Sequence, residues 1–121
     1  MSSYKDLDAF KACHQLTLAV GRIVRDFEER DAELAAQLWA AALVASSRIA
    51  RGSGVRNRRM FAACVARSLG ALSEIGYHVE MARSRQLITD KQRRELESLG
   101  GRALFYAMKL ALSLEAGPAA G

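Results

Sequence analysis

The chain has 121 residues, which is enough for one domain with a core of its own. It carries 18 Lys and Arg against 13 Asp and Glu, and the resulting net charge of +5 permits a nucleic-acid or anionic partner without requiring one. Half of the residues are hydrophobic, mainly Ala, Leu and Val, and the single proline is Pro118. With no strand-like alternation and no Asn-Gly turn, the composition argues against a β-sheet and predicts an all-α fold.

The sequence predicts neither a secretion signal nor a membrane span. Residues 1–6 contain no apolar core segment, and the weakly charged run Leu34–Ser47 is too short and too rich in Ala to cross a bilayer. We therefore expect a cytoplasmic protein.

The cysteines and histidines do not predict a metal site. Cys13 and Cys64 fall on apolar helical faces, which is typical of reduced core thiols. Together with His14 and His78 they lack the paired spacing of a zinc site. We expect the two histidines at the surface or at the rim of the core, and we predict no metal or other cofactor.

The first helix is expected from Asp6 to about Glu29, followed by a short polar turn. Its apolar positions are spaced by three and four residues, which predicts a stripe facing one partner or the core. The stripe consists of Phe10, Cys13, Thr17, Val20, Val24 and Phe27.

The second helix is expected to begin after a cap at Asp31 and to stop at Gly52. Its core face comprises Leu34, Leu38, Ala41, Ala45 and Ile49. Trp39 and Leu43 lie on a different face, so they predict a second buried surface, either within the molecule or at a subunit contact.

Two more helices follow. The third is expected after an Asn57 cap, and we interpret its Gly70 and Gly76 as points where another backbone comes close. The fourth begins at the capping box Thr89-Asp90-Lys91-Gln92. The expected core residues of these two helices are Phe61, Val65, Ser68, Leu72, Ile75, Val79, Ala82, Leu96, Leu99, Ala103, Tyr106 and Leu110.

Four such helices with short connections predict an antiparallel up-down-up-down bundle over residues 1–115. The small-residue tail 116–121 is expected to be disordered. This topology brings the turn between the second and third helices to the same end as both termini.

That turn is strongly cationic. Between Leu34 and Ser73 the chain has no Asp or Glu but six arginines, five of which surround Gly52-Ser53-Gly54. Three interpretations stay open: a solvated helix end, a subunit contact, or a site for an anion, of which RNA phosphate is the most plausible. The candidate nucleic-acid-binding residues are Arg48, Arg51, Arg56, Arg58 and Arg59.

Several segments resemble one family of small bacterial proteins, those encoded in intervening sequences of 23S rRNA genes. Residues 4–7, Tyr-Lys-Asp-Leu, resemble its opening. Residues 37–52 match its central pattern, roughly QLRRAAxSIPSNIAEG, at Gln37-Leu38, Ala41-Ala42, Ile49-Ala50 and Gly52. Phe61, Ala66, Gly70, Leu72, Glu74 and Ala82 match its third-helix pattern.

The resemblance implies an antiparallel four-helix bundle that assembles as a ring-shaped homopentamer. It also implies kinship with the accessory variability protein of retroelements, which works with a reverse transcriptase and nucleic acid. The chain departs from the central pattern at four places, with Trp39-Ala40 for Arg-Arg, Ser46 for Pro, Arg48 for Asn and Arg51 for Glu.

We therefore predict a non-enzymatic oligomer, with no catalytic residues and no small-molecule substrate, whose arginine-rich end contacts RNA. Trp39 and Leu43 are the candidate oligomer-interface residues. The alternative is a structural or adaptor bundle that binds a protein partner and has no nucleic-acid role.

Overall fold

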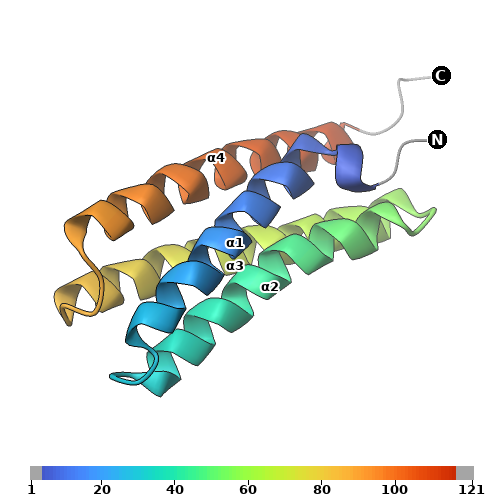
Figure 1. Cartoon of the computed structure of the whole chain (residues 1–121). Helices are drawn as coiled ribbons and strands as arrows, with labels where there is room; N and C mark the ends of the chain where they lie inside the picture. Colours follow the sequence, from blue (N-terminus) through green and yellow to red (C-terminus); the bar gives the residue numbers. More distant parts are fainter. Residues whose placement is uncertain (1–3, 117–121) are drawn as a thin grey trace.

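The computed structural model describes residues 4–116, and these fold into long helices joined by short turns (Figure 1). A single 3-10 turn, η1 (Tyr4–Asp6), precedes α1 (Asp8–Phe27). The helices α2 (Ala32–Ser53), α3 (Arg58–Ser84) and α4 (Asp90–Glu115) follow. The predicted all-α class is confirmed. Of the tail 116–121, only Ala116 is described, and the remainder lies outside the described residues.

The helices run alternately up and down, and each packs against two neighbours (Figure 1). The pairs in contact are α1–α2, α2–α3, α3–α4 and α4–α1. The start of the described chain, its end and the α2–α3 turn share one end of the bundle, while the α1–α2 and α3–α4 turns share the other. The predicted bundle and the expected position of the arginine-rich turn are therefore confirmed.

The helix starts follow the predicted caps, with one exception. The side chains of Asp31 and Asn57 accept hydrogen bonds from the backbone amides of Leu34 and Met60, both at 3.0 Å. The capping box at α4 is complete, because Thr89 and Gln92 bond each other's backbone at 3.0 and 2.9 Å. The exception is α1, which starts at Asp8 rather than Asp6 because Leu7 is extended.

The core contains the predicted faces of α2 and α3 almost unchanged, with Phe61 partly buried. The buried face of α1 is wider than the predicted stripe, since it also includes the fully buried Leu16 and Ile23, whereas Phe10 is only half-buried. A helix that packs against two neighbours buries a broader face than one coiled-coil seam. For the same reason α1 contributes small residues, Ala12 and Ala19, to the core.

A layer of small polar side chains crosses the core between α1, α2 and α3. The Thr17 hydroxyl oxygen lies 2.8 Å from the Cys13 carbonyl, 3.0 Å from the Ala42 carbonyl and 2.7 Å from the Ser46 hydroxyl. The Ser68 hydroxyl donates to the Ala45 carbonyl at 2.8 Å. Each buried hydroxyl is thus satisfied, which is the condition for keeping it in an apolar core. Ser46, at which the chain departs from the family pattern, contributes its hydroxyl to this layer by bonding Thr17.

The two cysteines are free thiols. Burial raises the pKa of Cys13 to about 11, against a smaller lowering by its hydrogen bond to Ser68. Cys13 therefore stays protonated and inert at neutral pH. Cys64, which belongs to α3, is half-buried against Gly52 at the end of α2.

The interpretation of Gly70 and Gly76 is wrong: a Cβ atom built at either position meets nothing within 4 Å. The close approach occurs at Gly52 instead. A Cβ atom there would lie 2.7 Å from Phe61 and 2.8 Å from the Cβ atom of Cys64. The last turn of α2 therefore needs a glycine in order to pack against the start of α3.

Candidate nucleic-acid and subunit interfaces

The five candidate arginines converge on one end of the bundle, which we call the cationic end. Arg48 and Arg51 lie in the last turns of α2, Arg56 lies in the turn, and Arg58 and Arg59 begin α3. The side chains are exposed except that of Arg48, which is half-buried. The short α2–α3 turn thus brings the arginines at the end of α2 and at the start of α3 to the same end of the bundle.

Arg58 differs from the other four. Its Nε donates to the carbonyl of Leu114 at 3.0 Å, and its Nη2 donates to that of Ser113 at 2.8 Å. A cation bonded to the last carbonyls of a helix also suits the negative end of the helix dipole. Arg58 therefore ties the start of α3 to the end of α4, a structural role that the sequence reasoning missed.

The remaining four arginines, Arg48, Arg51, Arg56 and Arg59, form no ion pair within residues 4–116. The α2–α3 turn and the helix ends that flank it contain no acid. Guanidinium groups without a carboxylate partner keep all of their donors available for an external anion.

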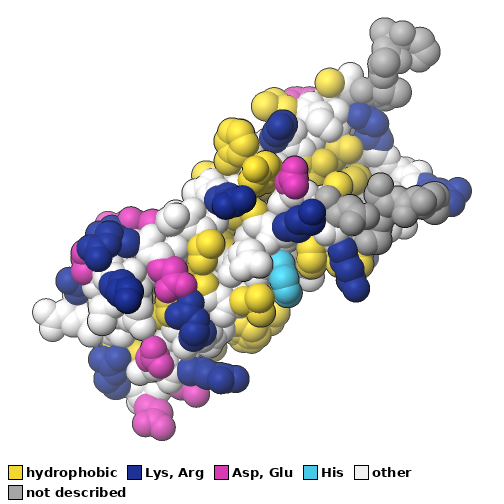
Figure 2. Space-filling model, turned by 45° about the horizontal axis from the view of Figure 1, so that its top comes forward, with side chains coloured by type: hydrophobic (Ala, Val, Ile, Leu, Met, Phe, Trp, Pro, Cys, Tyr) yellow, Lys and Arg dark blue, Asp and Glu magenta, His cyan; other side chains and the backbone are white. Residues whose placement is uncertain are grey.

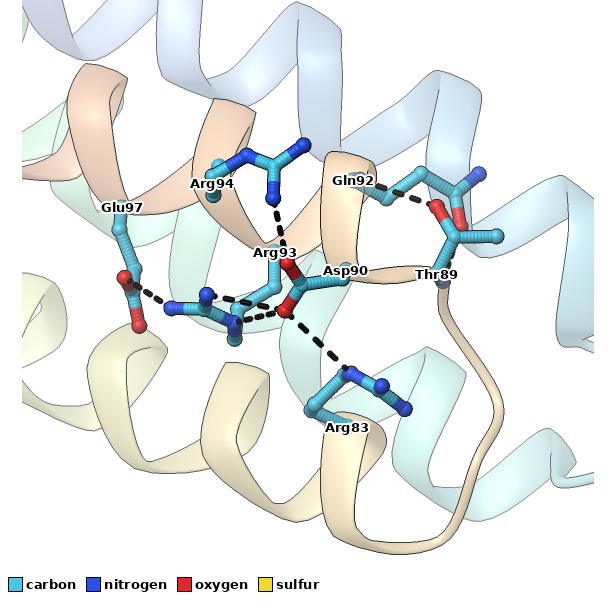
Figure 3. A network of polar contacts seen from close by, with 7 residues as sticks. All are labelled: Arg83, Thr89, Asp90, Gln92, Arg93, Arg94 and Glu97. Carbon is cyan, nitrogen blue, oxygen red and sulfur yellow. Dashed lines mark hydrogen bonds and ion pairs between the residues drawn. The ribbon is translucent and has the colours of Figure 1, made fainter.

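The opposite end of the bundle is organised differently (Figure 3). The Asp90 carboxylate at the start of α4 binds Arg93 at 2.9 Å, Arg83 at 3.8 Å and also Arg94, and Arg93 continues to Glu97 at 2.6 Å. The hydrogen bond from Arg93 holds the pKa of Asp90 below its usual range, helped by the charges of the surrounding arginines. Arg83, Arg93 and Arg94 at this end therefore form ion pairs with carboxylates of the same chain.

A groove extends the cationic end along the α2–α3 face. It has a volume of about 360 Å³, and Arg48 of α2 and Arg67 of α3 both line it. Its other lining residues include the small Ala41, Gly70 and Ala71, and also the acidic Glu74 of α3. Arg67 was outside the predicted set. Its facing position follows from the antiparallel register, in which the Ser68 hydroxyl bonds the Ala45 carbonyl.

A short row of rings lies beside the cationic end. Tyr4 meets Phe10 edge-on with ring centroids 4.9 Å apart, and Phe10 stacks on His14 at 5.5 Å. The η1 turn that carries Tyr4 packs against both α1 and α2. Tyr4 is 37% exposed and lies at the same end of the bundle as the α2–α3 turn.

Trp39 and Leu43 lie on the outer α1–α2 face, away from the core. They are 39% and 44% exposed, and Leu18 of α1 is 56% exposed. The Trp39 ring packs over Gly21, where a Cβ atom would come within 2.9 Å of it. Part of the Trp39 ring therefore packs against Gly21 of the same chain, and the rest of the side chain is exposed.

The same face contains a groove with a volume of about 820 Å³. Its walls are apolar near Trp39, Leu18 and Ala36, and its far end carries Arg25 and Glu28. This composition suits contact with a protein surface better than recognition of a small polar substrate.

No arrangement of residues typical of catalysis was found within residues 4–116. His14 is exposed and stacked on Phe10, while both ring nitrogens of His78 are buried without a hydrogen-bond partner, so His78 does not pair with Glu74. The described residues contain no group of three or more side chains placed to hold a metal ion. Within residues 4–116 no helix combines the length and the hydropathy that a membrane span requires.

Comparison with known proteins gives one family. No curated protein matches the chain. The pattern of the 23S rRNA-intervening sequence proteins matches residues 5–102, which span η1, α1, α2, α3 and the first half of α4. The chain therefore belongs to the 23S rRNA-intervening sequence protein family.

Proposed function

We propose that this protein is a non-enzymatic homo-oligomer that binds RNA through its cationic end. The observation that carries the proposal is the group Arg48, Arg51, Arg56 and Arg59, which is exposed or half-exposed and has no carboxylate partner within the described chain. Arginines in this state bind phosphate oxygens in pairs of parallel hydrogen bonds. The family's link to 23S rRNA genes supports RNA as the source of the phosphates.

The α2–α3 groove and the ring of Tyr4 extend this surface. Arg48 and Arg67 would hold a phosphate on either side of the groove, so the backbone of the RNA would run from the turn along α2 and α3. An unpaired base would stack on Tyr4. This geometry favours single-stranded or looped RNA over a regular duplex.

Filter binding to rRNA fragments across a salt series tests the proposal. Four phosphate contacts predict a log–log slope of roughly −3 to −4. The triple variant Arg51→Gln, Arg56→Gln, Arg59→Gln should weaken binding and make the slope shallower by about 2 to 3. The matched control Arg85→Gln, Lys91→Gln, Arg102→Gln removes equal charge from exposed cations outside the cationic end and the α1–α2 groove. Equal losses of RNA affinity in the two variants would show that net charge alone determines binding, and would contradict a site at the cationic end.

We further propose a homopentamer in which Trp39 and Leu43 contact the neighbouring subunit. The exposed apolar face around them and the adjoining groove support this assignment, because aromatic side chains anchor interfaces. Assembly would multiply weak attraction at each cationic end into multivalent binding. Light scattering should give five chain masses for the native protein and a smaller particle for Trp39→Arg. A native monomer at micromolar concentration would contradict the pentamer.

The alternative is an adaptor that holds a protein partner in the α1–α2 groove. The observation in its favour is the mostly apolar lining of that groove. Purification from the native host at low salt separates the two functions: RNA should accompany the RNA-binding protein, whereas a stoichiometric protein should accompany the adaptor. A cytoplasmic location stays a prediction from the sequence.

A further inference from the structure

A second exposed apolar surface lies on α4, directed away from the core. Leu104, Phe105, Met108 and Leu112 are 40%, 62%, 47% and 60% exposed. With Gly101 and Lys109 they line a shallow groove of about 470 Å³. We call this surface the α4 stripe. Large apolar side chains that are exposed side by side, rather than singly, are candidates for an interaction site.

The α4 stripe is separate from the face around Trp39. The core-facing residues of α4 are Leu96, Ala103 and Ala107. At 100° per residue, Met108 and Leu112 lie roughly 120–160° around the helix from them. Figure 2 looks onto the side of the bundle where α4 lies, and it shows hydrophobic side chains exposed over the middle of the molecule, with charges of both signs at one end. The stripe is also almost wholly beyond residue 102, where the family match ends.

We propose that the α4 stripe pairs with the α4 stripe of a second copy of this chain, antiparallel and across a two-fold axis. The spacing Gly101, Phe105, Met108, Leu112 is four, three and four residues, the repeat of a coiled-coil seam. A two-fold axis between positions 106 and 107 places Leu112 of each copy over Gly101 of the other. The same axis places Phe105 against Met108, so one register satisfies both contacts.

Shape supports this register. Gly101 has no side chain and lines the shallow groove, and a Cβ atom built there meets nothing within 4 Å, so the groove has room for a side chain at this position. The Leu112 side chain stands 60% exposed at the other end of the stripe. A protrusion and a hollow at equivalent distances from one axis make the surface self-complementary, which is the requirement of an isologous dimer contact.

Charge supports the same partner. The network at the start of α4 contains three arginines, Arg83, Arg93 and Arg94, but only two carboxylates, Asp90 and Glu97 (Figure 3). The proposed register brings Glu115 of the second copy to about one helical turn from Arg94. At each end of the pair, the exposed Glu115 carboxylate of one copy would then balance the one unmatched arginine charge in the network of the other.

The size of the stripe sets the strength of the contact. A standard stable interface buries about 800 Å² on each partner, which is more than one helical stripe of four side chains provides. The pair should therefore be weak, forming as the protein concentration rises. Association through α4 is independent of Trp39, because the two surfaces lie on different helices and different faces.

Cross-linking tests the register directly. In a Cys64→Ser background, Gly101→Cys and Leu112→Cys chains are mixed in equal amounts and oxidised; Cys13 is buried and protonated and does not interfere. The expected product is a disulfide between the two different chains. Predominant Leu112→Cys homodimers would show a parallel pair and overturn the proposal. Ser73→Cys, at an exposed position on α3, should remain uncross-linked.

Sedimentation equilibrium tests the association. Phe105→Glu should abolish the rise in mean mass with concentration, while Tyr77→Glu, at a 58% exposed aromatic outside the stripe, should preserve it. Trp39→Arg should leave particles that still pair, and Trp39→Arg with Phe105→Glu should be monomeric. Circular dichroism checks that each variant folds. Identical concentration dependence in Phe105→Glu and native protein would overturn the α4 pair and leave the Trp39 contact untouched.

Discussion

The two ends of the bundle use charge in opposite ways. At one end, the α3–α4 connection holds Arg83, Asp90 and Arg93 in a network of ion pairs within the chain. At the other, the α2–α3 turn carries arginines that form no ion pair within the described residues, except that Arg58 binds backbone carbonyls. A helix end therefore need not use its charges for its own fold. The end that leaves them unpaired is the better candidate for binding.

The largest expected effect concerns the packing that shapes the cationic end. Gly52→Ala should destabilise the fold by about 1–3 kcal/mol, because its Cβ atom would press on Phe61 and on the Cβ atom of Cys64. Gly70→Ala should instead stabilise it by about 0.5–1 kcal/mol, since the added methyl meets open space in mid-helix. Urea denaturation measures both. Equal effects of the two variants would show that α2 and α3 are not in tight contact at Gly52.

The next effect separates two adjacent arginines. Arg58→Ala should cost about 1 kcal/mol in unfolding free energy, because it removes two charged hydrogen bonds to the end of α4 at an exposed site. Arg59→Ala should change stability by less than about 0.5 kcal/mol. RNA binding should show the reverse order, with the larger loss in Arg59→Ala. If Arg58→Ala showed the larger loss in both stability and RNA binding, the distinction between a structural Arg58 and an RNA-binding Arg59 would be wrong.

How well the sequence predicts each region depends on whether the signal is local. The caps at Asp31, Asn57 and Thr89 depend on residues three apart in the chain, so they could be predicted and are observed. The core faces of α2 and α3 repeat regularly and could be predicted for the same reason. The wider face of α1 could not, because it depends on which two helices enclose it.

The sites depend on pairs that are distant in sequence. That Arg58 is bonded to Ser113 and Leu114, 55 and 56 residues away, is invisible in the sequence, as is the position of Arg67 across the groove from Arg48. The sequence predicts that the second helix stops at Gly52, but it does not show that Phe61 packs against this glycine. The exposed stripe on α4 had a readable signal, a second apolar repeat opposite the first, but a repeat alone does not tell which stripe faces the core.

A smaller effect is expected at the ion-paired end and depends on pH. The pKa of Asp90 is lowered in the folded chain from its usual 3.8, chiefly by the hydrogen bond from Arg93. A lowered folded pKa stabilises the protein above the unfolded pKa, and this stabilisation is lost as pH falls through the folded value. Asp90→Asn should therefore be less stable than native protein at neutral pH, and the gap should begin to narrow below about pH 4 and close as pH falls through the lowered folded pKa. A constant gap across thermal melts at several pH values would exclude ionisation of Asp90 as the cause.

The smallest effect is expected where the charge is unpaired. Arg51→Gln and Arg56→Gln should each leave the unfolding free energy within about 0.5 kcal/mol of native protein, because neither side chain forms an ion pair within residues 4–116 and each is repelled by its neighbours. Salt should sharpen the contrast between the ends. Screening weakens the ion pairs of Arg93 and Asp90 but relieves repulsion among the arginines of the turn. Hydrogen exchange in added salt should therefore slow at the α2–α3 turn and quicken at the start of α4. A uniform change along the chain would mean that the two ends are electrostatically alike.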